Sequence, residues 1–330
     1  MEHKLYPLKF TPVLKEKIWG GQKMKTRLGI NFSPLPNCGE AWMISGVEEN
    51  TSVVANGFLE GNELNELVEI YMGDLTGDAI FNKFGNEFPL LIKFIDAADW
   101  LSIQVHPDDE LAEKRGIGYG KSEMWYIMEA DKEAELITGF KRDSSQEEYL
   151  QHLQQNRLLD ILNVEKVSEG DVFYMPAGRV HALGPGILLA EIQQTSDTTY
   201  RIFDWNRVDD KGKARELHTE EALEAIDYQK SDDYKADYRR IPDGTASLVE
   251  SPYFTTNLIV VNKALAKDYT ELDSFVIYIA TKGSFTLVHD GSEEKMVKVK
   301  KGEAVLLPAI IDRVDIIPSE PSEILEVFIS

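Results

Sequence analysis

The chain has 330 residues, 43% of them hydrophobic and 28% charged, which is ordinary for a globular protein with a large buried core. Its formal net charge of -22 argues against nucleic acid and anionic membrane as partners, because both need a basic face. The single cysteine, Cys38, excludes an internal disulfide framework and a metal site made of cysteines alone.

The sequence lacks the long apolar run, about 18 residues, that a membrane-spanning helix needs. Residues 1–10 contain no apolar segment of the secretory type. We therefore expect a cytoplasmic protein.

Short apolar segments, separated by turns rich in Gly, Pro and Asp, predict an antiparallel sandwich or barrel. In chain order, strands are expected over 89–94, 101–105, 124–128, 171–175, 188–192, 275–280 and 304–307. Three helices are expected to interrupt them. The first covers 64–71 with Gly73 as its C-cap, the second follows a capping box of Ser145 and Glu148, and the third covers 220–226 behind Thr219 as N-cap.

The polar segment 230–244 contains Pro242 and is typical of a linker. It divides the chain into a predicted catalytic domain with helical insertions, residues 1–238, and a C-terminal domain, residues 239–330. The motifs GDVFYMP at 170–176 and GEAVLLP at 302–308 indicate two related barrels. Because Ala309 and Ile310 follow the second motif, without a Gly or His at the ligand position, no metal is expected in the C-terminal barrel.

Polar and apolar residues alternate in the segment LSIQVH, residues 101–106. In a strand, Ser102, Gln104 and His106 share one face, while the aliphatic residues share the other. For this segment alone, the favoured explanation is a half-exposed strand whose polar face meets water. Glu123 begins the next apolar strand, 17 residues after His106, where a surface or capping role is the alternative.

A second histidine, His181, follows a Gly-rich turn. A lone histidine near a turn is usually structural, but the spacing of Gly170, Pro176, Gly178 and His181 resembles the second signature of the cupin superfamily. Together, Gln104, His106, Glu123 and His181 offer an amide, two imidazoles and a carboxylate. Both Zn²⁺ and Fe²⁺ accept such ligands.

Several cations lie near these motifs. Lys93 interrupts the apolar segment LLIKFI, Lys121 precedes Glu123 by two residues, and Arg201 and Arg207 follow the polar loop QQTSDTT. A solvated cation or a surface ion pair explains each of them alone. As a set they favour a phosphorylated substrate.

Four segments, LSIQVHPDD, GKSEMWY, PAGRVHALG and QQTSDTTYRIFDW, together with WGG at 19–21, resemble the type I mannose-6-phosphate isomerases in their short bacterial form. The resemblance covers most of residues 1–235. It implies a mainly β protein of cupin-type jelly-roll barrels, the second one degenerate, with a few inserted helices. It also implies one Zn²⁺ per chain, held by Gln104, His106, Glu123 and His181, an active-site arginine at Arg201, and substrate contacts at Ser102, Lys93, Lys121 and Arg207.

The chain departs from the longer family members in two places. Only residues 144–163 fill the position of their large helical insertion, and Ser122 stands where some of them have proline. These departures concern the substrate loops and leave the metal ligands intact.

The implied reaction interconverts mannose 6-phosphate and fructose 6-phosphate through a cis-enediol, on which Arg201 would stabilise negative charge. Lys93, Ser102 and Arg207 are candidates for binding the phosphate, and Glu191 and Lys121 are both candidates for the general base. The expected partner is a small sugar phosphate, and the expected assembly is a monomer or weak homo-oligomer.

Two other interpretations stay open. One is a cupin Fe(II) oxygenase, which the cationic residues disfavour. The other is a non-catalytic sugar-binding cupin, which the presence of every predicted metal ligand and of Arg201 disfavours.

Overall fold

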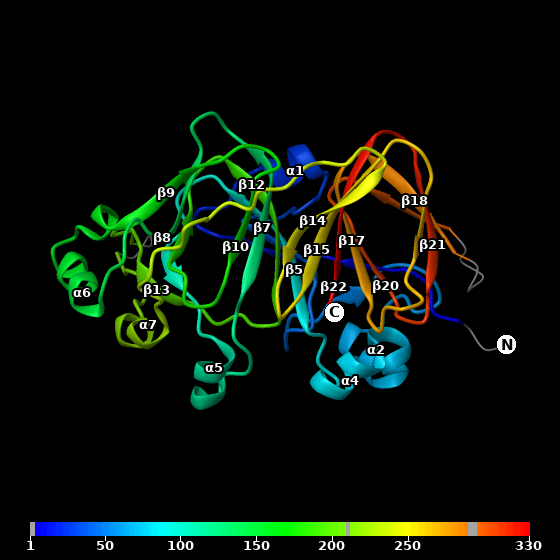
Figure 1. Ribbon diagram of the computed structural model, residues 1–330, viewed down its shortest axis with the longest axis horizontal. Coiled ribbons are helices and arrows are strands. Elements are labelled where there is room, and N and C mark those ends of the chain that lie inside the picture. The colour runs from blue at the N-terminus through cyan, green and yellow to red at the C-terminus, as the bar shows by residue number, and fades with distance from the viewer. Residues whose placement is uncertain (1–3, 209–211, 290–295) are drawn as a thin grey trace.

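The computed structural model describes residues 4–208, 212–289 and 296–330, and its strands form four sheets stacked along the long axis of the molecule (Figure 1). The predicted fold class, mainly β with jelly-roll barrels and a few inserted helices, is confirmed. All seven predicted strands are present, with ends that differ by up to three residues.

The N-terminal barrel consists of two sheets. In order across the sheet, the six-stranded one contains β10 (Val172–Met175), β7 (Glu123–Ala130), β12 (Ile187–Gln194), β5 (Leu90–Ala97), β3 (Glu40–Ile44) and β2 (Val13–Lys15). The five-stranded one contains β13 (Tyr200–Phe203), β6 (Ile103–Val105), β11 (His181–Leu183), β8 (Glu135–Phe140) and β9 (Leu162–Lys166).

The C-terminal barrel also consists of two sheets. The seven-stranded one contains β14 (Gly244–Glu250), β15 (Thr255–Val261), β22 (Ser322–Phe328), β17 (Val276–Lys282), β20 (Ala304–Leu307), β1 (Leu8–Thr11) and β4 (Val53–Val54). The four-stranded one contains β16 (Leu265–Asp268), β21 (Arg313–Pro318), β18 (Ser284–Val288) and β19 (Met296–Lys300). Strand β1 pairs with β20, so the start of the chain contributes to this barrel.

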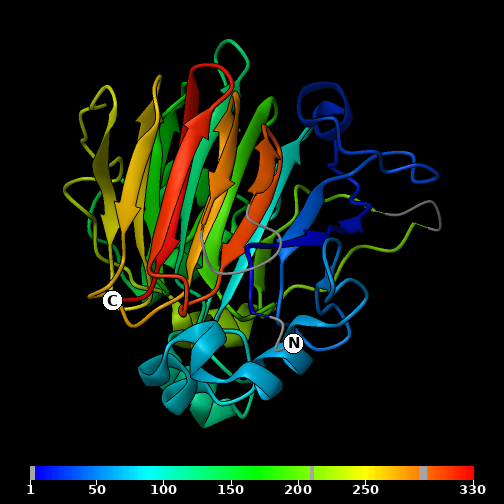
Figure 2. The same ribbon diagram turned by 90° about the vertical axis from the view of Figure 1, so that its right-hand side faces the viewer.

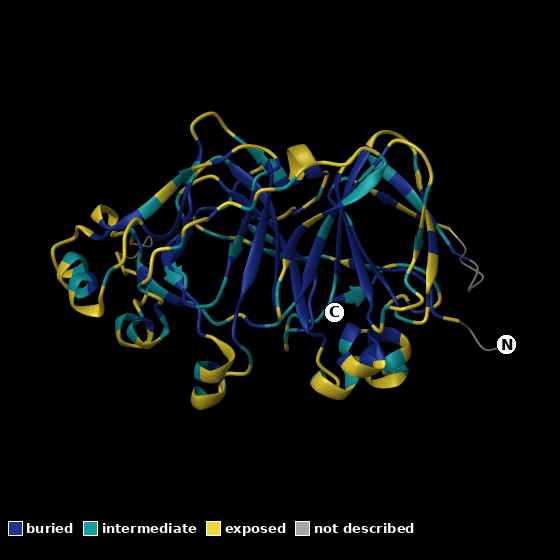
Figure 3. Cartoon of the chain, viewed as in Figure 1, coloured by how far each residue is buried: buried dark blue, intermediate teal, exposed yellow. Residues whose placement is uncertain are grey.

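The two barrels pack against each other through their larger sheets, whose central strands, such as β5 and β12, are buried on both faces (Figure 3). Residues alternate along each central strand. In β12, Ala190 and Ile192 join the core between the barrels, whereas Leu189 and Glu191 face the interior of the N-terminal barrel. This arrangement explains why the central strands are nearly continuous apolar segments that carry single polar residues.

Helices lie at the ends and edges of the sheets. α2 (Leu64–Tyr71), α3 (Gly73–Thr76) and α4 (Asp78–Phe84) gather below the strand ends (Figure 2). α6 (Gln146–Gln154), the 3₁₀ helix η1 (Leu158–Asp160) and α7 (Thr219–Ala225) lie outside the five-stranded sheet, where they cover its outer core. α1 (Lys23–Leu28) and α5 (Asp109–Arg115) complete the described helices. None of the helices in the described ranges is long and apolar enough to cross a membrane.

The three predicted helices are confirmed as α2, α6 and α7, but two of their predicted caps are wrong. α2 ends at Tyr71 with Met72 as its C-cap, which takes a positive φ of 47°, and Gly73 already begins α3. α7 is preceded by His218, so Thr219 is its first residue. Ser145 does cap α6 by accepting a hydrogen bond from Glu148 N–H, while the Glu148 side chain bonds to Arg142 and Ser144.

The predicted boundary at 238/239 falls in a segment without helices or strands, and β14 begins after it at Gly244. The division into two domains stays a prediction. The register supports the relation between the barrels: Glu123 pairs with Met175 before Pro176, and Val276 pairs with Leu307 before Pro308. Val276 therefore stands in the C-terminal barrel where Glu123 stands in the N-terminal one.

Candidate metal centre and active site

Three strands of the N-terminal barrel bring the four predicted metal ligands together. Gln104 lies in β6 and pairs directly with His181, the first residue of β11. His106 follows the end of β6, and Glu123 begins β7 in the facing sheet. The ligands therefore meet inside the barrel, although up to 77 residues separate them in the chain.

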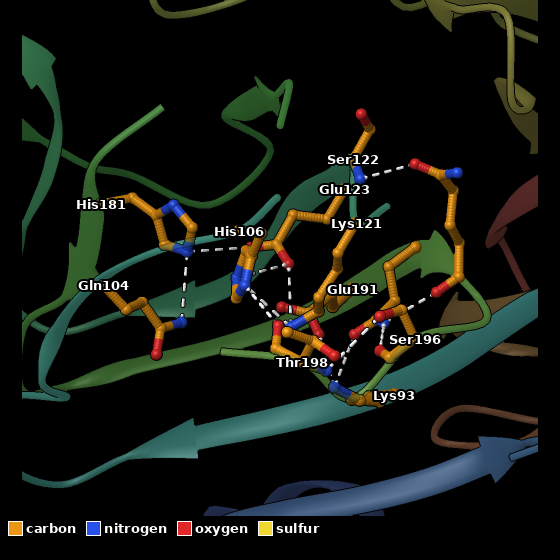
Figure 4. A network of polar contacts seen from close by, with 12 residues as sticks. Lys93, Gln104, His106, Lys121, Ser122, Glu123, His181, Glu191, Ser196 and Thr198 are labelled. Atoms are coloured by element: carbon orange, nitrogen blue, oxygen red, sulfur yellow. Dashed lines mark hydrogen bonds and ion pairs between the residues drawn. The ribbon is translucent and has the colours of Figure 1, made fainter. Parts of the chain in front are cut away.

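The two histidines and Glu123 form a compact buried cluster, in which the candidate ligand atoms lie within 4.8 Å of one another (Figure 4). Glu123 Oε1 is 3.3 Å from His181 Nε2, and Glu123 Oε2 is 3.5 Å from His106 Nε2. The side-chain amide nitrogen of Gln104 is 3.2 Å from His181 Nε2. Rotating this amide by 180° would present its oxygen to the same point.

Backbone carbonyls orient both imidazole rings. His106 Nδ1 is 2.9 Å from the carbonyl oxygen of Thr198, and His181 Nδ1 is 2.8 Å from that of Arg179. A ring that donates from Nδ1 presents an unprotonated Nε2, the arrangement of a metal-binding histidine. Burial lowers the pKa of His181 to about 4, and burial together with Lys121 lowers the pKa of His106 well below its ordinary value. Both rings are therefore neutral near pH 7.

Glu123 is fully buried, and neither of its carboxylate oxygens accepts a hydrogen bond from the described part of the chain. Lys121 approaches Oε2 to 3.4 Å. Burial and the neighbouring Glu191 raise the pKa of Glu123 to about 7, against the opposing effect of Lys121 and Lys93. A buried carboxylate without hydrogen bonds is costly unless a cation accompanies it. Two neutral imidazoles, this carboxylate and the Gln104 amide therefore fit a divalent first-row metal ion.

A cavity of about 440 Å³ opens beside the cluster. Its charged lining consists of six cations and three acids, besides His181. The cations are Lys15, Lys17, Lys93, Lys121, Arg201 and Arg215, and the acids are Glu40, Glu191 and Asp197. The excess of positive charge is notable in a chain whose net charge is -22, and it suits an anionic ligand.

Lys93 lines the cavity and is itself buried. Its ammonium is 3.0 Å from Glu191 Oε1, donates to Gln193 Oε1 at 2.6 Å and lies 5.1 Å from the centre of the Trp42 ring. Trp125 Nε1 donates to the other oxygen of Glu191 at 2.9 Å. Lys93 and Lys121 outweigh the effect of burial and keep the pKa of Glu191 below its ordinary value, so this carboxylate is ionised.

The structure brings most of the predicted functional residues to this cavity: Lys93, Ser102, Lys121, Glu191 and Arg201 all line it. Lys121 Nζ is 3.3 Å from His106 Nε2, next to the ligand atoms. Leu101, which strict alternation predicts on the other face, also lines the cavity, because β6 begins only at Ile103.

Arg207 is placed differently from the other predicted residues. It donates to the carbonyl oxygen of Trp100 at 2.6 Å and to Asp204 Oδ1 at 2.6 Å. Arg215 also binds Asp204, through Nε at 2.7 Å from Oδ2. Of these two arginines, only Arg215 belongs to the cavity lining as far as the structure describes it.

Sequence reasoning missed several lining residues: Lys15, Lys17, Glu40, Trp42, Asp197 and Arg215. Lys15 on β2 and Glu40 and Trp42 on β3 reach the cavity because β3 pairs with β5 beside Lys93. The other three lie in loops. In this region of the sequence, the WGG segment is the motif that the resemblance includes, and its first residue, Trp19, lines the cavity.

A larger cavity, about 1010 Å³, lies between the four-stranded sheet, α2 and the start of the chain. It contains none of the three clustered ligands that the described residues offer to a metal. Cavity volume alone would therefore point to the larger cavity as the candidate active site. The candidate metal ligands lie beside the smaller cavity instead.

Comparisons with known proteins identify the family of this chain. The family model of the phosphomannose isomerase type I catalytic domain matches residues 7–152. The mannose-6-phosphate isomerase of Streptococcus mutans is 36% identical over 306 residues, which cover 92% of this chain and 93% of that protein. The mannose-6-phosphate isomerase ManA of Bacillus subtilis is 37% identical over 308 residues, with the same coverage of 92% and 93%.

The crystal structure of the mannose 6-phosphate isomerase from Bacillus subtilis matches with a TM-score of 0.87 at 33% identity, covering 98% of this chain and 99% of that one. The similarity thus extends over both barrels, beyond the segment in which the sequence motifs lie. The chain belongs to the type I phosphomannose isomerase family.

Proposed function

We propose that this protein is a metal-dependent aldose-ketose isomerase that interconverts mannose 6-phosphate and fructose 6-phosphate through a cis-enediol, with one Zn²⁺ per chain. The observation that carries the proposal is the contact between the buried His106, Glu123 and His181 cluster and a cavity lined with excess positive charge. The cluster fits a divalent metal, and the lining fits a phosphorylated substrate. The names of the relatives support the same reaction.

The metal would be held by Gln104, His106, Glu123 and His181, and when bound it supplies a Lewis acid next to the reacting oxygens. Arg201, which lines the cavity, stabilises the negative charge of the enediol. The ionised Glu191 accepts the proton that leaves C2 and returns it to C1, and Lys121 moves a proton between the substrate oxygens O2 and O1 near the metal ligands.

The phosphate lies at a distance from the reacting carbons, so its binding positions them. We assign phosphate binding to Ser102, Lys93 and Arg215. Arg215 takes this role in place of Arg207, because it shares Asp204 with Arg207 but itself lines the cavity. The resemblance predicts Arg207 instead, and substitution of each arginine discriminates between the two.

We further propose that the protein acts in the cytoplasm as a monomer or weak homo-oligomer, with a sugar phosphate as its partner and neither nucleic acid nor membrane. The net charge of -22 opposes polyanionic partners, and a buried free thiol at Cys38 suits a reducing compartment.

The test is a coupled assay of fructose 6-phosphate formation from mannose 6-phosphate, on protein whose metal content has been measured. We expect activity that a chelator abolishes and Zn²⁺ restores. His181→Ala should lose bound metal and about 100-fold or more of the activity. His152→Ala, a histidine in α6 away from the cavity, is the matched control.

Inactivity of well-folded, zinc-loaded protein would contradict the proposal. Oxygen uptake by iron-loaded protein would favour the oxygenase interpretation instead, and sugar-phosphate binding without turnover would favour a binding module.

A further inference from the structure

Arg201 makes three hydrogen bonds to residues 216–218. Its backbone N–H donates to His218 Nδ1 at 3.0 Å, and its carbonyl oxygen accepts from His218 N–H at 2.8 Å. Its Nη1 donates to the carbonyl oxygen of Glu216 at 2.9 Å. Both backbone groups of Arg201 therefore bond to a single residue.

This arrangement completes an open edge of the sheet. Among the described strands, β13 is an edge strand that pairs only with β6, so the polar groups on its other side have no strand partner in the described part of the chain. Unpaired edge groups cost free energy when they are removed from water. His218 satisfies both groups of Arg201, one with its ring and one with its own backbone, and thereby replaces a further strand at this position.

The Arg201 side chain has few other bonds that fix it. Its Nε is buried and has no hydrogen-bond partner in the described part of the chain, and Glu216 holds one terminal nitrogen. The direction of the guanidinium in the cavity therefore depends on where the backbone of residue 201 lies. A shift of about 1 Å in a group that stabilises charge is enough to slow a reaction strongly.

His218 precedes α7, and a capping role would be the ordinary explanation for a polar residue there. Its side chain makes no capping hydrogen bond to the helix. The ring lies 6.2 Å from that of Tyr200, and its Nδ1 bonds to Arg201. The His218 ring therefore bonds to the backbone of Arg201 and does not cap α7.

We propose that His218 is a positioning residue for the isomerase reaction, which acts by fixing the backbone of Arg201 and so the guanidinium in the cavity. The inference rests on the function proposed above. It assigns a role to His218, which the sequence analysis left without one.

The test is a set of His218 variants combined with Arg201→Ala. His218→Asn places an amide oxygen where Nδ1 lies, whereas His218→Gln, of similar chemistry, places it one bond further away. We expect His218→Gln and His218→Ala to lower kcat about 10-fold with KM changed less than about 3-fold, and His218→Asn to keep most of the activity. In the Arg201→Ala background, the His218 substitutions should cause no further loss.

Full activity of His218→Ala, equal activity of the Asn and Gln variants, or an undiminished loss in the Arg201→Ala background would each overturn the inference. The Asn and Gln comparison keeps the test valid if His218→Ala folds poorly. Wild-type protein that lacks isomerase activity would refute the proposed function and the inference together, whereas active wild-type protein with indifferent variants would refute the inference alone.

Discussion

The hydroxyl oxygen of Ser122 accepts a hydrogen bond from the backbone N–H of Ala177 at 3.1 Å. Ser122 precedes the metal-ligand candidate Glu123, and Ala177 lies in the loop that leads to His181. The same loop is bonded to His106, whose carbonyl oxygen accepts from Gly178 N–H at 2.9 Å. These two contacts connect the three segments that carry the cluster.

Loss of this hydroxyl should weaken metal binding. Ser122→Ala leaves the Ala177 N–H without its acceptor. It thereby removes a hydrogen bond between the loop that leads to His181 and the residue that precedes β7. Because groups that orient metal ligands typically change metal affinity 10–100-fold, we expect about 10-fold weaker Zn²⁺ binding. Competition with a fluorescent chelator measures it, and Ser247→Ala, an exposed serine of β14, serves as control. Equal affinities of wild type and Ser122→Ala would refute this role.

The two arginines that share Asp204 should differ in their effect on the phosphorylated substrate. Arg215→Ala removes a cation from the cavity, so we expect KM for mannose 6-phosphate to rise about 10-fold or more. Arg207→Ala leaves Arg215 bonded to Asp204 and should change KM much less. Steady-state kinetics of both variants, with inorganic phosphate as inhibitor, decide between them. A larger effect at Arg207 would favour the residue that the resemblance predicts.

The sequence predicts well those features that depend on local pattern. The alternation around Gln104 predicts the strand that contains it, and the Gly-rich turn precedes His181, which begins β11; the direct pairing of these two residues was not predicted. Gly178 takes a φ of 88° in the turn before His181, which agrees with its place in the motif. Long-range meeting of these ligands followed only from the resemblance, because no local pattern specifies which strands face each other across a barrel.

Local sequence patterns do not predict which residues reach the cavity through the pairing of distant strands. Glu40 and Trp42 lie in β3, which pairs with β5 although about 50 residues separate the two strands. Arg207 and Arg215 have the same side chain and both bond to Asp204, and only the fold distinguishes them, because Arg215 lines the cavity and Arg207 is not among its described lining residues.

The thiol of Cys38 should be unreactive in the native protein. It is buried and donates to the carbonyl oxygen of Glu40 at 3.3 Å, and burial raises its pKa from 9.0 to about 11. Since the thiolate is the reactive form, we expect labelling by a disulfide reagent at pH 8 to be at least about 100-fold slower than in urea-unfolded protein. The time course of labelling in both states measures this ratio. Rapid labelling under native conditions would contradict the burial of this residue.

Glu40 should make the stability of the protein sensitive to acid. Its side chain is 14% exposed, lies 2.9 Å from Lys17 Nζ and accepts from Trp42 Nε1 at 2.8 Å. Burial alone would raise its pKa, but Lys93 and Lys17 outweigh burial and lower the pKa from 4.5 to about 2.

Because the pKa is lower in the folded state, Glu40 stabilises the protein above its unfolded value of 4.5, and this contribution is lost as the pH falls from there toward 2. The difference in free energy of unfolding between wild type and Glu40→Gln, which does not titrate, should therefore shrink by about 1 kcal/mol between pH 7 and pH 4. Urea unfolding at both pH values measures it. A difference that stays constant, or that grows toward pH 4, would mean that the two lysines do not hold this carboxylate ionised in the folded protein.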